Sequence, residues 1–176
     1  MEEAYKYPRV WSFPPLFTLQ RSEVSRASQL NTWASILNGW CGHTHCYAFS
    51  RKWPVFTNRQ IDRVAGDDLI AAILEHLRSI GRILVKGAQT YLLPVSFDTL
   101  CREFIRFCVE KYGSDGATLL DDLLADLPPE SVFEHLDLDI LEEIVTRLKK
   151  EQKLEFTLDY KEQRFNGLVE LRSFNL

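Results

Sequence analysis

The sequence predicts an α+β, mostly helical chain, because the same order of elements occurs twice along it. In each half, segments with apolar residues at helical spacing are followed by two short β-like runs around a turn. A segment rich in proline and aromatic residues precedes the first half. Hydrophobic residues make up 45% of the 176 residues, which is typical of globular domains. Two small domains behind an N-terminal arm are therefore expected.

Residues 1–20 are predicted to form this arm. The stretch from Trp11 to Thr18 reads WSFPPLFT and places four large apolar side chains around a Pro-Pro pair. Proline fixes φ near −65° and disfavours helical geometry in the residue before it, so residues 13–16 are expected to be a stiff polyproline-type segment. Such a segment either packs on its own domain or fills a pocket on another protein, a known mode of recognition.

The first domain is predicted to span residues 21–95. A helix is expected from about Ser25 to Cys41, a short helix around 59–64, and a helix capped by Asp67 or Asp68 that ends near Gly81. Residues 82–86 and 90–94 read as a hairpin.

The second domain is predicted to span residues 96–176. Helices are expected at about 98–112, 119–124 and 139–152, the last with Asp139 and Glu142 in a capping box. Strands are expected at 154–160 and 168–172. Three helices followed by a two-stranded wing define a winged helix, so the sequence predicts two of them in tandem with a boundary near Val95–Phe97.

Charge is unevenly distributed along the chain. Residues 1–96 carry 11 Lys and Arg against 7 Asp and Glu, and residues 97–176 carry 10 against 18, giving +4 and −8 for a total of −4. The acidic half is a poor nucleic-acid surface and suits a basic partner. No apolar run reaches the length of a membrane span, and no secretory leader is visible. The four cysteines are too few for a disulfide scaffold, so an intracellular compartment is expected.

One short segment, Cys41-Gly-His43-Thr-His45-Cys46, contains residue types that bind zinc. Six consecutive residues do not easily place four ligands tetrahedrally, so a buried cysteine beside loop histidines is favoured and no metal or other cofactor is predicted. Neither His76 nor His135 has a nucleophile or carboxylate partner in a motif, and no phosphate-binding loop is present. The chain is therefore expected not to be an enzyme.

Nucleic-acid binding is the main alternative, because winged helices often bind DNA and a winged-helix transcription regulator would share this fold. The expected recognition helices are acidic at their starts, however, with Asp67 and Asp68 in the first domain and Asp137 and Asp139 in the second. Phosphate contacts require Lys and Arg there. The basic residues Arg51, Lys52, Arg59 and Arg63 form either a solvated loop, which is favoured, or a contact to an acidic protein or lipid surface.

The segment from Trp11 to Gln20, followed by a helix bearing Leu30, Trp33 and Cys41, resembles the small subunit of the endosomal sorting complex ESCRT-II. That family has a proline-aromatic arm and two winged helices. The resemblance implies a non-enzymatic adaptor whose arm binds the two larger subunits of ESCRT-II, with a homodimer as a further expectation for the isolated chain. It also implies a cytoplasmic protein that is recruited to the endosomal membrane without inserting into it and that serves multivesicular body sorting of ubiquitinated cargo.

The resemblance also implies which residues bind partners. Those that match or flank the arm motif are Phe13, Pro14, Pro15, Leu16 and Phe17, while Tyr7 and Trp11 lie where some members have a second motif. The second winged helix of the family recruits the first subunit of ESCRT-III. The acidic residues Asp121, Asp122 and Glu134 are the candidate contacts for it here, with a solvated acidic face as the alternative.

Overall fold

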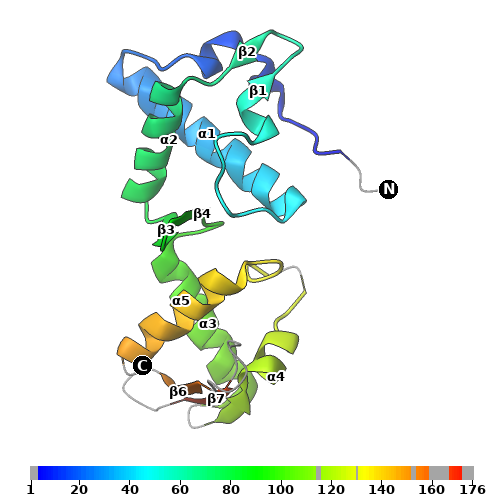
Figure 1. Cartoon of the computed structure of the whole chain (residues 1–176), viewed down its shortest axis with the longest axis vertical. Coiled ribbons are helices and arrows are strands. Elements are labelled where there is room, and N and C mark those ends of the chain that lie inside the picture. Colours follow the sequence, from blue (N-terminus) through cyan, green and yellow to red (C-terminus); the bar gives the residue numbers. More distant parts are fainter. Residues whose placement is uncertain (1–3, 114–115, 130, 152–153, 159–166, 172–176) are drawn as a thin grey trace. The chain divides into compact units, whose positions relative to one another are not determined.

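The computed structural model describes residues 4–113, 116–129, 131–151, 154–158 and 167–171 (Figure 1). The chain divides into two compact units, residues 1–94 and 95–176. The predicted ends of two strands, residues 159–160 and 172, lie outside the described residues. No described helix is long and apolar enough to cross a membrane.

The first unit is built on one long helix and one shorter amphipathic helix. Its elements, in chain order, are the 3₁₀ turns η1 (Arg9–Ser12) and η2 (Pro14–Phe17), α1 (Glu23–Thr44), η3 (Pro54–Phe56), β1 (Thr57–Asn58), β2 (Arg63–Val64), α2 (Asp67–Ser79), β3 (Ile83–Lys86) and β4 (Gln89–Leu92). Strands β3 and β4 pair antiparallel from Ile83↔Leu92 to Lys86↔Gln89 and form the predicted wing. A bridge between Ala48 and Tyr91 adds a third partner to this wing.

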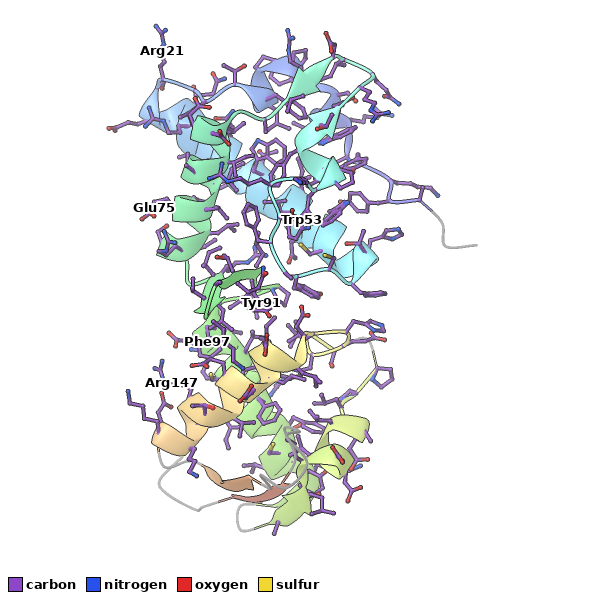
Figure 2. The ribbon with its side chains drawn as sticks, viewed as in Figure 1. Arg21, Trp53, Glu75, Tyr91, Phe97 and Arg147 are labelled. Atoms are coloured by element: carbon purple, nitrogen blue, oxygen red, sulfur yellow. The ribbon has the colours of Figure 1, made fainter. Side chains whose placement is uncertain are left out.

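Aromatic side chains fill the core of the first unit. Trp33 on α1 is fully buried and lies 5.7 Å from Phe56, centroid to centroid, while Trp40 lies 4.7 Å from Trp53. Figure 2 shows Trp53 and Tyr91 on the interior side, whereas Arg21 and Glu75 project away from the unit. The buried stripe of α2 completes this core, with Leu69, Ile70, Ile73 and Leu77.

Three local predictions for the first unit are wrong. The expected short helix at 59–64 is instead the turn of a hairpin between β1 and β2, paired at Thr57↔Val64 and Asn58↔Arg63. Helix α1 continues past the predicted end at Cys41 to Thr44, and its C-cap is His45, which takes a left-handed φ of 51°. The N-cap of α2 is Gly66, so Asp67 and Asp68 lie in its first turn, where their charge suits the helix dipole.

The second unit has the full element order of a winged helix. Its elements are α3 (Phe97–Tyr112), β5 (Ala117–Leu119), α4 (Leu120–Ala125), α5 (Leu138–Lys150), β6 (Leu154–Leu158) and β7 (Gly167–Leu171). Strand β7 lies between β5 and β6 and pairs antiparallel with both, so the sheet has three strands rather than the two predicted. Apolar side chains of α3, α4 and α5 form its core, including the fully buried Leu100, Phe104, Leu120, Ile140 and Leu148.

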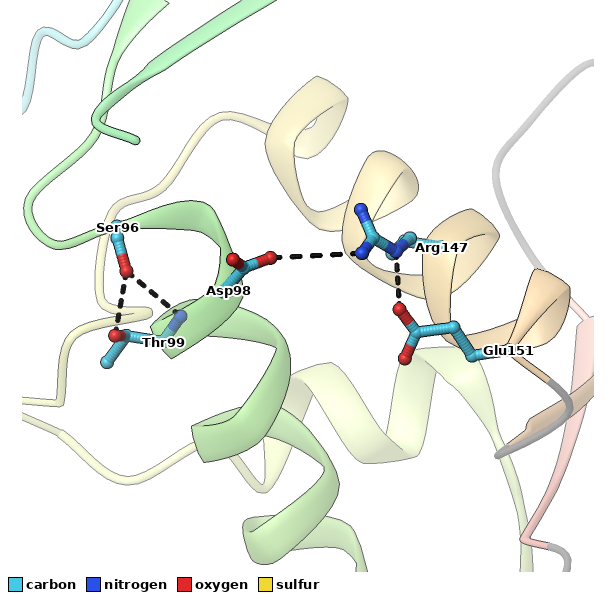
Figure 3. Close-up of polar contacts among 5 residues, drawn as sticks. All are labelled: Ser96, Asp98, Thr99, Arg147 and Glu151. Atoms are coloured by element: carbon cyan, nitrogen blue, oxygen red, sulfur yellow. Dashed lines mark hydrogen bonds and ion pairs between the residues drawn. The ribbon is translucent and has the colours of Figure 1, made fainter. Parts of the chain in front are cut away.

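Polar contacts fix the start of α3 and link it to α5 (Figure 3). The hydroxyl oxygen of Ser96, the N-cap, accepts a 3.2 Å hydrogen bond from the backbone N–H of Thr99. On the other helix, Arg147 pairs with Glu151 and lies 3.9 Å from the carboxylate of Asp98. The predicted capping box at Asp139 is wrong, because α5 begins one residue earlier with Asp137 as its N-cap.

Candidate partner-binding surfaces

The arm is not extended, so the prediction of a polyproline-type segment is wrong. Residues 9–12 and 14–17 form the two 3₁₀ turns η1 and η2, and only Phe13 between them keeps extended dihedral angles. Proline stands at the first two positions of η2, where its φ near −65° suits a 3₁₀ helix and its missing N–H has no helical partner to lose. The Pro-Pro pair thus begins a turn.

Three large arm side chains are buried in the first unit. Trp11, Leu16 and Phe17 are 9%, 5% and 3% exposed. Phe17 packs edge-on between two indoles, with its ring centre 6.2 Å from Trp11 and 5.5 Å from Trp33. Tyr7 stacks on Trp11 at 3.8 Å. Of the predicted anchors, Leu16, Phe17 and Trp11 are therefore part of the core of the first unit, whereas Phe13, Pro14 and Pro15 remain exposed.

Polar side chains of α1 hold the arm through its backbone. Trp33 Nε1 donates to the carbonyl of Leu16 at 2.9 Å. The amide nitrogen of Gln29 donates to the carbonyls of Leu16 and Thr18 at 2.9 and 2.8 Å, while its oxygen accepts from the N–H of Gln20 at 3.1 Å. Buried backbone groups require such partners. The arm is therefore fixed on α1 by a buried amide that matches its carbonyls.

The turn η3 and the strand β1 that follows it hold the other side of the arm. Trp11 Nε1 donates to the carbonyl of Val55 at 2.9 Å, and Asn58 Nδ2 donates to the carbonyl of Trp11 at 3.0 Å. Asn58 is fully buried and Gln29 is 6% exposed. Neither residue was among those predicted from the sequence to be functional. Gln29 could have been found as a polar residue within the apolar stripe of a predicted helix. No local sequence pattern indicates that Asn58 is buried.

The solvent-exposed apolar surface of the arm consists of the Phe13 ring and of Pro14 and Pro15. Phe13 is 57% exposed, and Val24, in the first turn of α1, is 82% exposed. A shallow groove runs between the arm and α1, lined mainly by Val10, Phe13, Pro15, Val24, Ser28 and Thr32. Exposed aromatic and branched side chains around a groove are typical of binding surfaces.

The second unit carries the other predicted contacts. Asp121 and Asp122 are exposed in the first turn of α4, and Glu134 lies in the loop before α5, 3.3 Å from the imidazole of His135. The structure also shows a groove that the sequence did not reveal, between α3 and residues 128 and 131–133. It is lined by Val95, Phe107, Pro128 and Val132, with Glu103 and Glu110 also contributing.

The cysteine-histidine segment does not form a ligand set. Cys41 is buried in the core, and burial raises the pKa of its thiol to about 12, whereas His43 and His45 are exposed. Among the described residues, no group of three or more His, Cys, Asp or Glu side chains is placed to hold a metal ion.

Cations near both ends of α2 are paired with carboxylates. Arg51 contacts the carboxylate of Asp67, and Arg78 donates to Glu75 at 2.7 Å. These pairs reduce the positive charge that α2 presents for phosphate contacts.

Two helix-and-wing units in one chain define a tandem winged-helix protein, a fold that supports many unrelated functions. Comparison with known sequences identifies the family within this fold class. A family model described as ESCRT-II complex subunit matches residues 10–115, more than half of the chain. The chain belongs to this family.

Several individual proteins are similar to this chain. It is 32% identical to a zebrafish (Danio rerio) vacuolar protein-sorting-associated protein 25 over 84 residues, which cover 46% of this chain and 48% of that protein. It is 26% identical to the same-named protein of Xenopus laevis over 159 residues, covering 86% and 91%.

Solved structures show the same fold. A crystal structure of subunit VPS25 of the endosomal trafficking complex ESCRT-II aligns with a TM-score of 0.74 at 19% identity, covering 94% of this chain and 98% of that one. A chain in the crystal structure of the endosomal complex ESCRT-II, VPS22/VPS25/VPS36, aligns with a TM-score of 0.70 at 20% identity, covering 93% and 98%.

Proposed function

We propose that this protein is a non-enzymatic adaptor subunit of ESCRT-II that acts in endosomal sorting. Its arm and first unit would bind the two larger subunits, and its second unit would recruit the initiating subunit of ESCRT-III. The observation that carries the proposal is the family match, which begins at residue 10 and so includes residues 10–20 of the arm. A similar subunit is part of the VPS22/VPS25/VPS36 assembly.

Phe13, Pro14 and Pro15 are the anchor that the folded arm supports best. They are exposed, whereas Leu16 and Phe17 are buried beneath them. The exposed ring of Phe13 directly precedes the turn η2. Gln29 and Trp33 hold the Leu16 carbonyl of that turn, and the Leu16 N–H donates to the carbonyl of Phe13, so docking would cost little conformational entropy. Such a pre-ordered aromatic residue is typical of binding hot spots.

The test is co-purification of this chain with the two larger subunits. Replacing Phe13 with alanine should weaken assembly by about 2 kcal/mol or more, the scale of a hot-spot residue. Val85 in the wing is also 57% exposed, so Val85→Ala is the matched control and should assemble normally. Assembly of Phe13→Ala at wild-type level would refute the arm as the anchor.

For the second unit, we propose that an ESCRT-III subunit docks on an acidic face. The candidate contacts are Asp121 and Asp122 on α4 and Glu134 before α5, and the excess of acidic residues after residue 97 favours a basic partner. The apolar groove beside Glu110 offers a neighbouring place for a partner helix.

Two charge reversals separate these surfaces. Asp121→Lys with Asp122→Lys should weaken binding of the purified ESCRT-III subunit if α4 is the docking face, and Glu110→Lys should do so if the groove is. Wild-type binding by both variants would refute an electrostatic docking face at either place. Retained binding to the larger subunits is the control for folding.

A further inference from the structure

Two half-buried tyrosines at the start of the arm pack against aromatic residues of the first unit. The ring of Tyr7 stacks on that of Trp11, with ring centres 3.8 Å apart and planes 12° apart. Burial, and next the neighbouring Tyr5, raise the pKa of the Tyr7 hydroxyl, whereas a hydrogen bond with Trp40 of α1 opposes this shift. Tyr5 in turn packs edge-on against Tyr7, with ring centres 4.9 Å apart. The two rings thus extend the aromatic core toward the start of the chain.

Tyr5 lies on the last turns of α1, over a residue that has no side chain. Its hydroxyl oxygen is 2.6 Å from the point that a Cβ atom would occupy on Gly39, and its ring carbons Cζ and Cε2 are 3.5 and 3.7 Å from that point. The ring centre of Tyr5 is also 5.5 Å from that of His43. A carbon atom at 2.6 Å would overlap with the oxygen, whereas 3.5–3.7 Å is ordinary van der Waals contact. The glycine is therefore what admits the Tyr5 hydroxyl.

These contacts fix the chain on the N-terminal side of Phe13. Trp11, on which Tyr7 stacks, belongs to η1, and its backbone N–H donates to the carbonyl of Pro8 at 2.9 Å. In the same turn, the N–H of Phe13 donates to the carbonyl of Val10 at 3.0 Å. On the C-terminal side, α1 holds the turn η2. Phe13 consequently stands between two turns that are each held on the first unit.

From this arrangement we infer that Tyr5 and Tyr7 form an intramolecular clasp that positions Phe13 for docking, and that the bare backbone of Gly39 is the seat of this clasp. The inference rests on the proposed function for the docking step. It gives the two tyrosines a positioning role in place of a direct contact with a partner. An arm held on both sides of Phe13 keeps this ring in place before binding, so less conformational entropy is lost on association.

Gly39→Ala tests the seat, because it places a methyl group where the Tyr5 hydroxyl lies. It should displace Tyr5 and accelerate amide hydrogen exchange at Trp11 and Phe13 by about threefold or more, because η1 would then open more often. Gly42→Ala is the matched control, since it makes the same change in the same helix. Apart from its own stretch of helix, no described atom lies within 4 Å of the corresponding point, so exchange should be unchanged.

Tyr5→Phe separates the effect of the hydroxyl from that of the ring. It removes the atom that would meet the new methyl group and keeps the ring contacts with Tyr7 and His43. Tyr5→Phe combined with Gly39→Ala should therefore exchange at the wild-type rate. The inference is overturned if Gly39→Ala exchanges as slowly as Gly42→Ala, or if the double variant exchanges as fast as Gly39→Ala.

Binding of the full-length chain to the two larger subunits tests the positioning role. Gly39→Ala should weaken binding by about fivefold, the scale of ordering one or two side chains, and adding Tyr5→Phe should restore it. Faster exchange with wild-type binding would overturn the positioning role. Weaker binding by Tyr5→Phe alone, at unchanged exchange, would overturn it as well, because the hydroxyl would then contact a partner. If the wild-type chain binds neither subunit, the proposed function falls, and the exchange rates alone decide whether the clasp exists.

Discussion

The indole Nε1 of Trp33 lies 2.9 Å from the backbone carbonyl oxygen of Leu16 and donates a hydrogen bond to it in the core of the first unit. A side chain in the middle of α1 thereby holds a turn of the arm. The same turn carries the exposed Pro14 and Pro15 on its other side. Stability of the first unit and presentation of the docking surface consequently depend on the same few contacts.

Phe17 and Phe13 should respond differently to truncation. Phe17 is 3% exposed between two indoles, so Phe17→Ala should lower the free energy of unfolding by about 3–5 kcal/mol. Phe13 is 57% exposed, so Phe13→Ala should change it by only about 0.5 kcal/mol. Urea denaturation followed by tryptophan fluorescence measures both. Equal losses in the two variants would contradict the assignment of Phe17 to the core.

Gln29 should fix the arm on α1. Replacing it with leucine leaves the carbonyls of Leu16 and Thr18 without its amide and the N–H of Gln20 without an acceptor. Unsatisfied buried groups cost about 1–3 kcal/mol, so stability should fall by that order. Amide hydrogen exchange should accelerate at residues 16–20 in particular.

Thr32→Ala, one turn further along α1, is the control for Gln29→Leu. Its hydroxyl donates to the carbonyl of Ser28 on the exposed side of the helix, so the arm should be unaffected. Equal exchange rates for residues 16–20 in the two variants would show that Gln29 does not hold the arm.

The Tyr112–Asp126 pair should make the second unit sensitive to acid and to strong base. The Tyr112 hydroxyl donates to the Asp126 carboxylate at 2.7 Å, which lowers the pKa of Asp126. A lowered folded-state pKa contributes stability above the unfolded pKa, and this contribution is lost as pH falls through the acidic range. The pKa of Tyr112 is raised from 10.0 to about 12, mainly by burial and secondly by the hydrogen bond to Asp126. The stability that Tyr112 contributes is therefore lost as pH rises from about 10 through the folded-state pKa.

Tyr112→Phe tests this pair. The variant should be less stable than the wild type near neutral pH, and the difference should shrink at acidic pH. Denaturation of both proteins across the pH range, together with ultraviolet titration of the tyrosines, provides the measurement. A stability difference that is constant with pH would exclude the linkage.

Cysteine reactivity should follow burial. Burial raises the thiol pKa of Cys41 and of Cys108 to about 12, and only the thiolate reacts readily with alkylating agents. Cys46 is only half-buried and should be labelled first. Timed labelling with iodoacetamide, read by mass spectrometry, gives the order. Early labelling of Cys41 would contradict its place in the core, and unfolding in urea should make all four cysteines reactive.

Long amphipathic segments made much of this fold predictable. The buried stripes of α2, α3 and α5 recur at helical spacing, so each was predicted to within two residues at both ends. The tandem winged-helix fold is confirmed by the solved relatives.

The errors came from features that one local pattern does not determine. A Pro-Pro pair fits polyproline and 3₁₀ geometry equally well, and burial of Leu16 and Phe17 decides between them. Strands β1 and β2 have two residues each, too few to show alternation. The exposure of Phe13 next to the burial of Phe17 follows from their tertiary surroundings, so the motif alone did not rank them.

The middle position of β7 in its sheet has a consequence during synthesis. Strand β5 has β7 as its paired neighbour, and β7 follows the whole of α4, α5 and β6 along the chain. As the polypeptide leaves the ribosome, all elements of the first unit are synthesised early. In the second unit, β5 and β6 remain unpaired until β7 emerges. Such unpaired edges attract other chains. Early binding by partner subunits or chaperones would protect the unpaired strands from aggregation. Ribosomes stalled before β7 should yield a first unit that resists protease and a second unit that is cleaved.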